Sequence, residues 1–124
     1  MLLLWSVARS PAATAPDDVP AVERLLAHDP DALLIAHFDG LIVGTAVAAW
    51  DGWRGHIYRL VVLPDDRLRG VGRRLVASGH ERLRALGATR VNAAVSDDEP
   101  GPIAFWEAIG YRRDPGMSRF AMSL

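Results

Sequence analysis

The chain has 124 residues, 50% of them hydrophobic and 23% charged, which fits one domain, 1–124, around a single core. Its 14 basic residues are all arginine and face 15 acids, so the near-zero net charge argues against general affinity for nucleic acid or an anionic membrane. The absence of cysteine excludes disulfides, thiolate metal sites and cysteine nucleophiles. No apolar run approaches the ~18 residues of a membrane-spanning helix, and the apolar start at 1–5 lacks the basic flank of a signal peptide. We therefore expect a soluble, cytoplasmic protein without a metal.

The first half of the chain predicts a strand, a short helix and an antiparallel meander. Residues 2–9 are apolar enough for a strand, and a helix over 17–28 follows with a proline in its first turn. The apolar stretch 32–49 is divided by Asp39-Gly40, a dipeptide suited to a tight hairpin turn. Residues 56–63 alternate at first and then become wholly apolar, as a central strand buried on both faces does.

The second half predicts a long amphipathic helix, a strand, a short helix and a closing hairpin. Apolar residues recur at helical spacing from Val71 to Leu86, with Gly87 as the C-terminal cap and Arg82 and Arg84 on the solvated face. The last elements, in chain order, are a strand at 89–96, a helix at 101–109 capped by Gly110, and a hairpin at 111–124. Antiparallel strands followed by a strand-helix-strand unit predict an α+β fold with a mixed, mostly antiparallel sheet flanked by helices.

The segment between the central strand and the long helix concentrates glycine and arginine. It reads Arg67-Leu68-Arg69-Gly70-Val71-Gly72-Arg73-Arg74-Leu75. A helix N-terminus presents unpaired backbone N–H groups and partial positive charge, and glycine lets a ligand come close to the main chain. The pattern therefore predicts an anion cradle suited to two or more phosphates, against the alternative of an ordinary turn with solvated arginines.

Two common phosphate-binding motifs do not fit this segment. A Walker A loop requires Lys and then Ser or Thr after its last glycine, where this chain has Arg73-Arg74. A dinucleotide-binding fingerprint requires a third glycine and opens its domain, whereas this turn follows a meander.

Arg67-x-x-Gly70-x-Gly72 resembles the [Gln/Arg]-x-x-Gly-x-[Gly/Ala] motif of the GNAT superfamily of N-acetyltransferases. The preceding strand ends Val62-Leu63-Pro64, as it does in that family. A second signature, aromatic-acid-x-aliphatic-Gly-aromatic, is matched by 106–111. The predicted order of elements resembles the GNAT fold over almost the whole chain, with an unusually short first helical region.

The resemblance implies acetyl-CoA as co-substrate and acetyl transfer to an amine of a small molecule or peptide. The pantetheine arm is expected along Val61, Val62 and Leu63 of the central strand. The phosphates are expected at Arg67 and at the turn and first helical residues, with contact of the arginine side chains left open. These residues are Leu68, Arg69, Gly70, Val71, Gly72, Arg73, Arg74 and Leu75.

Acetyl transfer needs a base, because an alkyl ammonium with a pKa near ~10 is not nucleophilic. His56 is the candidate for the catalytic base, since some lysine-acetylating members have a catalytic Glu at the matching place. The alternatives are a structural turn histidine, with deprotonation by solvent or by an acid such as Asp97.

The chain departs from the family at Trp106, where many members have a tyrosine thought to protonate the departing thiolate. Indole has a donor but no useful acidity, so Trp106 is either a core residue beside the cofactor or a sign of lost catalysis. A non-catalytic acyl-CoA-binding or sensor module is therefore the alternative function. The sequence leaves open the acceptor, the acyl-chain preference and the oligomeric state, a homodimer included.

Overall fold

The computed structural model describes residues 18–64, 70–98 and 100–124, and these divide into two compact units between Ala94 and Val95. The predicted strand at 2–9 and the motif residues Arg67, Leu68 and Arg69 lie outside the described residues. None of the described helices is long and apolar enough to cross a bilayer.

The first described element is helix α2, Val19–His28, and it has the expected cap and stop. Asp18 accepts a 2.8 Å hydrogen bond from the Ala21 backbone N–H, and Pro20 occupies the first turn, where its missing N–H costs nothing. The backbone N–H of Asp29 donates to Leu25 O at 2.8 Å and ends the helix.

The predicted meander is confirmed as strands β1 (Leu33–Phe38), β2 (Leu41–Trp50) and β3 (Gly55–Val62), each antiparallel to the next. Asp39 and Gly40 take φ values of 51° and 77°, the left-handed pair that a two-residue hairpin requires. β2 runs through the middle of this meander and is buried from Val43 to Ala48.

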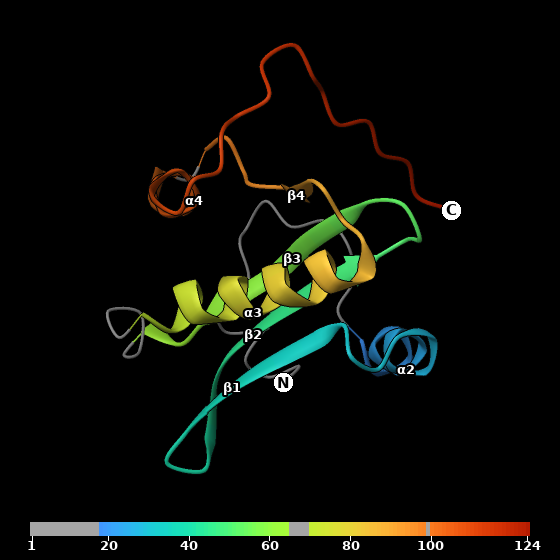
Figure 1. Ribbon diagram of the computed structural model, residues 1–124, viewed down its shortest axis with the longest axis vertical. Helices are drawn as coiled ribbons and strands as arrows, with labels where there is room; N and C mark the ends of the chain where they lie inside the picture. The colour runs from blue at the N-terminus through green and yellow to red at the C-terminus, as the bar shows by residue number, and fades with distance from the viewer. Residues whose placement is uncertain (1–17, 65–69, 99) are drawn as a thin grey trace. The chain divides into compact units, whose positions relative to one another are not determined.

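A crossover helix and a short parallel strand complete the first unit (Figure 1). Helix α3, Val71–Leu86, ends at Gly87 with φ of 114°, which confirms the predicted cap. Strand β4, Val91–Ala93, pairs in parallel with Gly55–Ile57 of β3, giving the order β1-β2-β3-β4. β4 is thus shorter than the strand predicted at 89–96.

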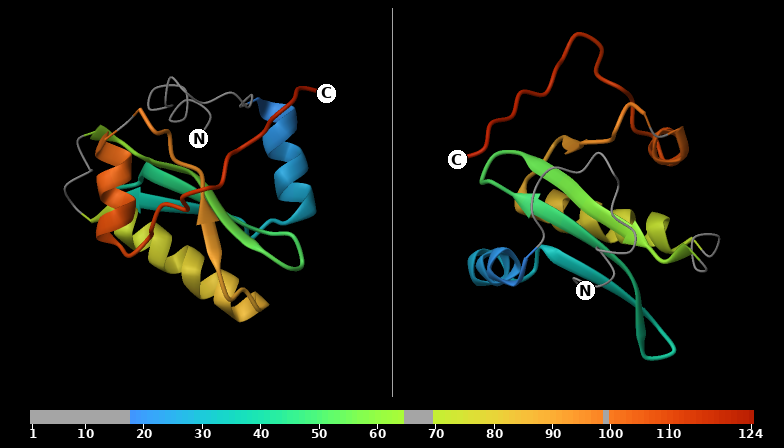
Figure 2. Two further views of the ribbon diagram at one scale, coloured as in Figure 1. Left: turned by 90° about the horizontal axis from the view of Figure 1, so that it is seen from above. Right: turned by 180° about the vertical axis from the view of Figure 1, so that it is seen from behind.

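Helices α2 and α3 cover opposite faces of the sheet, as seen from above in Figure 2. Under α3 the packing is close, because a Cβ added to Gly79 would lie 3.1 Å from Cδ1 of Ile57. Under α2, Val22 and Val47 form a buried cluster that Val61 joins. The β3 strand therefore has side chains in both cores.

The second unit contains helix α4, Pro100–Ala108, and an extended tail. Gly110 has φ of 104°, and the Tyr111 N–H donates to Trp106 O at 3.0 Å, so the predicted glycine cap is confirmed. The hairpin predicted at 111–124 is wrong, because the structure has a turn at 115–116 but no strand in this segment. A two-stranded ribbon needs a surface to cover its apolar side, and Phe120 in this tail is 94% exposed.

Candidate functional site

The N-terminus of α3 begins at a glycine in the left-handed conformation. Gly70 has φ of 74°, and its carbonyl accepts the first helical bond from the Arg74 N–H at 3.1 Å. No described atom lies within 4 Å of a Cβ added at Gly70, so the space beside its main chain is open. The structure therefore places an accessible glycine where the helix dipole and free N–H groups favour an anion.

The predicted site residues after Gly70, apart from the half-buried Val71, separate into two sets on α3. The side chains of Arg73 and Arg74 are exposed, whereas Gly72 and Leu75 are buried. Arg73 and Arg74 are thus free to meet a ligand through their side chains. Gly72 and Leu75 can offer only backbone groups, since the rest of each residue belongs to the core.

Strand β3 continues past the end of its parallel neighbour. The β3–β4 ladder contains Gly55, His56 and Ile57 and stops there, while β3 runs on to Val62. The predicted arm-binding residues Val61, Val62 and Leu63 are half-buried at this end, and the Leu63 N–H donates to Val43 O at 2.9 Å. Beyond Ile57, β3 has no further pairing with β4 among the described residues, as an inserted extended ligand requires.

A β-bulge interrupts β3 between its two halves. Thr45 pairs with Val61 and Val47 with Tyr58, so two residues of β3 stand opposite one of β2. Arg59 takes φ of 52°, an uncommon value for a residue other than glycine. The buried Thr45 hydroxyl donates to Arg59 O at 3.2 Å and fixes the bulge. This bulge was not predicted from the sequence, since neither arginine nor threonine indicates a bulge by its residue type.

His56 lies on β3 beside the acidic turn that connects β2 to β3. Its Nε2 is 3.7 Å from Oδ2 of Asp51, and the side chains of His56 and Asp51 are 40% and 43% exposed. Asp51 Oδ1 accepts hydrogen bonds from the backbone N–H groups of Arg54 at 2.5 Å and Trp53 at 2.8 Å. These two bonds, the one from Arg54 first, hold the pKa of Asp51 below its usual value. The carboxylate is therefore a fixed anion next to the imidazole.

Two polar residues lie near His56 on the same face of the sheet. Tyr58 is two positions along β3, and Asn92 is the β4 partner of His56. Burial raises the pKa of Tyr58, with the Arg59 charge opposing the shift, so the phenol stays neutral. The face thus presents a base candidate, a phenol and an amide.

Trp106 lies in the second unit and packs as a core residue. It is 9% exposed and meets Phe105 and Tyr111 edge to face, with ring centroids 5.5 and 4.6 Å away. Burial raises the pKa of Tyr111 to about 12. These contacts account for the indole by packing.

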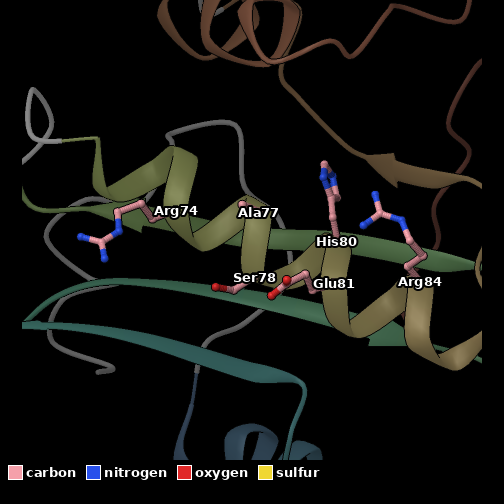
Figure 3. Close-up of a pocket in the computed structure, with 6 residues that line it drawn as sticks. All are labelled: Arg74, Ala77, Ser78, His80, Glu81 and Arg84. Atoms are coloured by element: carbon pink, nitrogen blue, oxygen red, sulfur yellow. The ribbon is translucent and has the colours of Figure 1, made fainter.

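The outer surface of α3 carries a shallow hollow, drawn in Figure 3. Its residues all come from this helix: Arg74, Ala77, Ser78, His80, Glu81 and Arg84. Burial first, and then the Arg84 charge, lower the pKa of His80. The labelled side chains extend outward from the helix without converging, so the hollow does not resemble an active site.

Arg82 was expected on the solvated face of α3, and this prediction is wrong. Its guanidinium forms an ion pair with Asp29, and its Nε donates to Ala48 O at 3.2 Å. The Ala32 N–H, which lies opposite Ala48, donates to Asp29 O and not to Ala48 O. The Arg82 guanidinium therefore supplies the donor for Ala48 O. Arg84 is exposed, as predicted.

Comparison with known proteins identifies the family to which this chain belongs. The model of the acetyltransferase (GNAT) family matches residues 2–111. An acetyltransferase of Pectobacterium atrosepticum is 38% identical over 90 residues, which make up 73% of this chain and 64% of that relative. An acetyltransferase of Yersinia pseudotuberculosis has the same identity and coverage. The chain therefore belongs to the GNAT family, and the match spans 64% of the length of these relatives.

Solved structures agree with this fold. The aminoglycoside 6'-N-acetyltransferase AAC(6')-Ig of Acinetobacter haemolyticus superposes with a TM-score of 0.76 at 18% identity, covering 99% of this chain and 90% of that one. The aminoglycoside N-acetyltransferase AAC(6')-Iy in complex with CoA gives 0.73 at 21% identity, covering 99% and 89%. At this level of identity the similarity concerns the fold.

Proposed function

We propose that the chain is a single-domain N-acetyltransferase that moves an acetyl group from acetyl-CoA to a primary amine of a small molecule or peptide. The observation that carries the proposal is the junction of β3 and α3. There β3 continues beyond Ile57, its last residue paired with β4, and α3 starts at Gly70 with open space beside that glycine. The family assignment, and a relative in fold solved with CoA, support the same co-substrate.

The residues at this junction fit acetyl-CoA. A pyrophosphate needs several N–H donors at a helix N-terminus and room to approach them; the first turn of α3 would supply the donors, and the open space at Gly70 the room. Arg73 and Arg74 are exposed one turn away and suit phosphate geometry. The half-buried backbone from Val61 to Leu63 would hold the extended arm. Acetyl-CoA supplies the thioester whose carbonyl carbon the amine attacks.

The protein would contribute a base and positioned donors. His56 would take the proton of the ammonium, so that the nitrogen lone pair becomes free to form the new N–C bond as the C–S bond breaks. The leaving thiolate needs little help, since a thiol with a pKa of ~8.5 is largely stable as the anion during departure. Trp106 is a core residue, and its indole has no useful acidity for protonating the thiolate.

The second candidate function is an acyl-CoA-binding module without catalysis. The packing of Trp106 between Phe105 and Tyr111 favours it, because no phenol stands at the position where relatives place their acid. Such a module would bind acetyl-CoA and release no thiol.

Release of free CoA tests both candidates. The protein is mixed with acetyl-CoA and a panel of amines, including aminoglycosides, polyamines and lysine peptides, and the thiol is measured with a chromogenic disulfide. Amine-dependent release supports the enzyme. Binding of acetyl-CoA without release across the panel supports the module instead.

The remaining partners follow from charge. The near-zero net charge gives no reason for nucleic-acid or membrane binding. The proposed partners are acetyl-CoA and an amine, and the proposed compartment is the cytoplasm. Light scattering would show whether the protein forms a homodimer.

A further inference from the structure

The turn between β2 and β3 carries an acid whose two carboxylate oxygens have different partners. Oδ1 of Asp51 is occupied by the N–H groups of Trp53 and Arg54. Oδ2 lies 3.7 Å from Nε2 of His56 and 3.6 Å from Nε of Arg54. One oxygen therefore anchors the carboxylate, and the other is presented to two cationic or proton-bearing groups.

The anchoring matters because it fixes where Oδ2 lies. The chain turns back at Asp51, where its own N–H donates to Arg54 O at 3.2 Å, so the carboxylate is held by a closed turn rather than by one flexible rotamer. His56 is in turn fixed in the sheet, paired with Ala49 on one side and Asn92 on the other. Neither of these strand partners carries charge, and the titratable group beside His56 on its own strand is Tyr58.

We propose that Asp51 is a positioning residue for acetyl transfer. Its Oδ2 holds the Nε2–H of the His56 imidazole and leaves the Nδ1 lone pair to receive the ammonium proton. The inference rests on the proposed function in which His56 is the base. A contact of 3.7 Å is longer than a hydrogen bond, and catalytic hydrogen bonds are often long before the substrates bind and shorten in the working complex.

Two protons leave the ammonium nitrogen on the way to the amide, and each has an acceptor. One proton leaves the ammonium nitrogen and binds Nδ1, so the imidazole becomes an imidazolium, with its new charge facing the Asp51 carboxylate. The amine then attacks the carbonyl carbon with its lone pair, the C–S bond breaks, and the second nitrogen proton, lost as the amide forms, passes to the departing CoA thiolate. Asp51 stays ionised throughout, which agrees with the lowered pKa that its two backbone bonds give it.

Asp51→Asn tests the role without removing the turn. The amide oxygen can still accept from Trp53 and Arg54, whereas the NH₂ group cannot accept from the imidazole. We expect kcat with an accepted amine to fall about tenfold, with the KM for acetyl-CoA unchanged. Asp51→Glu, which restores the charge, should recover part of kcat, and Asp51→Asn should cost nothing further in a His56→Ala background. The matched control, Arg54→Ala, removes the other ion pair and should leave kcat within twofold.

A spectroscopic readout separates this inference from the proposed function. The ring nitrogens of His56, assigned by their loss in His56→Ala, should show one dominant neutral tautomer in the wild type and a mixture in Asp51→Asn. If no amine releases CoA, the proposed function fails, and the tautomer comparison alone decides whether Asp51 orients His56. Unchanged ring nitrogen shifts in Asp51→Asn, or an unchanged kcat where His56→Ala is impaired, would overturn the proposal.

Discussion

The imidazole of His56 is half-exposed on β3, within reach of both solvent and Asp51. His56→Ala should lower kcat about a hundredfold or more, because positioned bases contribute on the order of 10²–10⁴ to rate. Acetyl-CoA binding should stay intact, since the side chain is not part of the glycine turn. Steady-state kinetics with an accepted amine, together with a CoA binding titration, measure the two effects.

His56→Glu serves as the rescue, because a carboxylate is the base at the matching position in some members of the family. It should restore part of the activity lost in the alanine variant. If the alanine variant keeps near-normal kcat from pH 6 to 9, His56 is a structural residue. The ammonium proton then goes to solvent or to the carboxylate of an acid such as Asp97.

Gly70 owes its identity to backbone conformation, and a matched glycine isolates the ligand effect. Gly70 and Gly40 have φ values of 74° and 77°, with no described atom within 4 Å of an added Cβ. Each alanine variant should lose about 1 kcal/mol of unfolding free energy, from left-handed strain. Only Gly70→Ala should also lose acetyl-CoA affinity, by about tenfold or ~1.4 kcal/mol. Equal affinities for acetyl-CoA in the two variants would mean that no phosphate approaches Gly70.

Single residues were predictable from sequence where their type is restricted by local geometry. Gly87 and Gly110 were placed correctly as C-terminal caps, since left-handed caps favour glycine. The pairing of Asp51 with His56 was not predictable, because it depends on how a turn closes. The bulge at Arg59 was likewise hidden, since arginine gives no sign of a positive φ.

At the scale of elements, Arg82 joins α3 to strand β2 and to Asp29, the residue that ends α2. The Arg82 side chain is only 15% exposed and that of Asp29 is 23% exposed. Removing one partner therefore leaves the charge of the other partly buried and unpaired. Arg82→Ala should therefore cost about 2 kcal/mol, between the values for surface and buried pairs. Urea denaturation measures this loss.

Arg84→Ala is the control on the same helix and should change the unfolding free energy by less than about 0.5 kcal/mol. A double variant with Asp29→Asn should lose less than the sum of the two single variants. Additive losses would show that the ion pair contributes nothing and that Arg82 acts through Ala48 alone.

Helices and strands were predictable where hydrophobic periodicity and turn residues agree. The helix at α3 and the hairpin at Asp39-Gly40 have both signals. The tail at 111–124 has turn residues and apolar residues, yet it forms no strand among the described residues. A strand needs a partner edge, and sequence periodicity carries no information about which edge is available.

For the whole molecule, a ligand that binds only the folded state must stabilise it. Acetyl-CoA at a hundred times its dissociation constant should add ~2.7 kcal/mol and raise the melting temperature by about 10 °C. Differential scanning fluorimetry across a concentration series measures the shift. A larger shift with ATP or NAD at matched saturation would contradict acetyl-CoA as the co-substrate.

The bulge in β3 amounts to an insertion that the core does not need. If Arg59 were deleted, Leu60 would stand opposite Ala46 while Val61 and Tyr58 kept their partners on β2, so the strand would become regular with its register unchanged. The variant should fold with a modest loss, about 1 kcal/mol for the Thr45 hydrogen bond, measured by thermal melting. It should nevertheless lose turnover, because the backbone beside the proposed thioester position would straighten. Arg59 holds an uncommon backbone angle at a position that the register of β2 and β3 does not require, and a loss of turnover on its deletion would assign that angle to the chemistry.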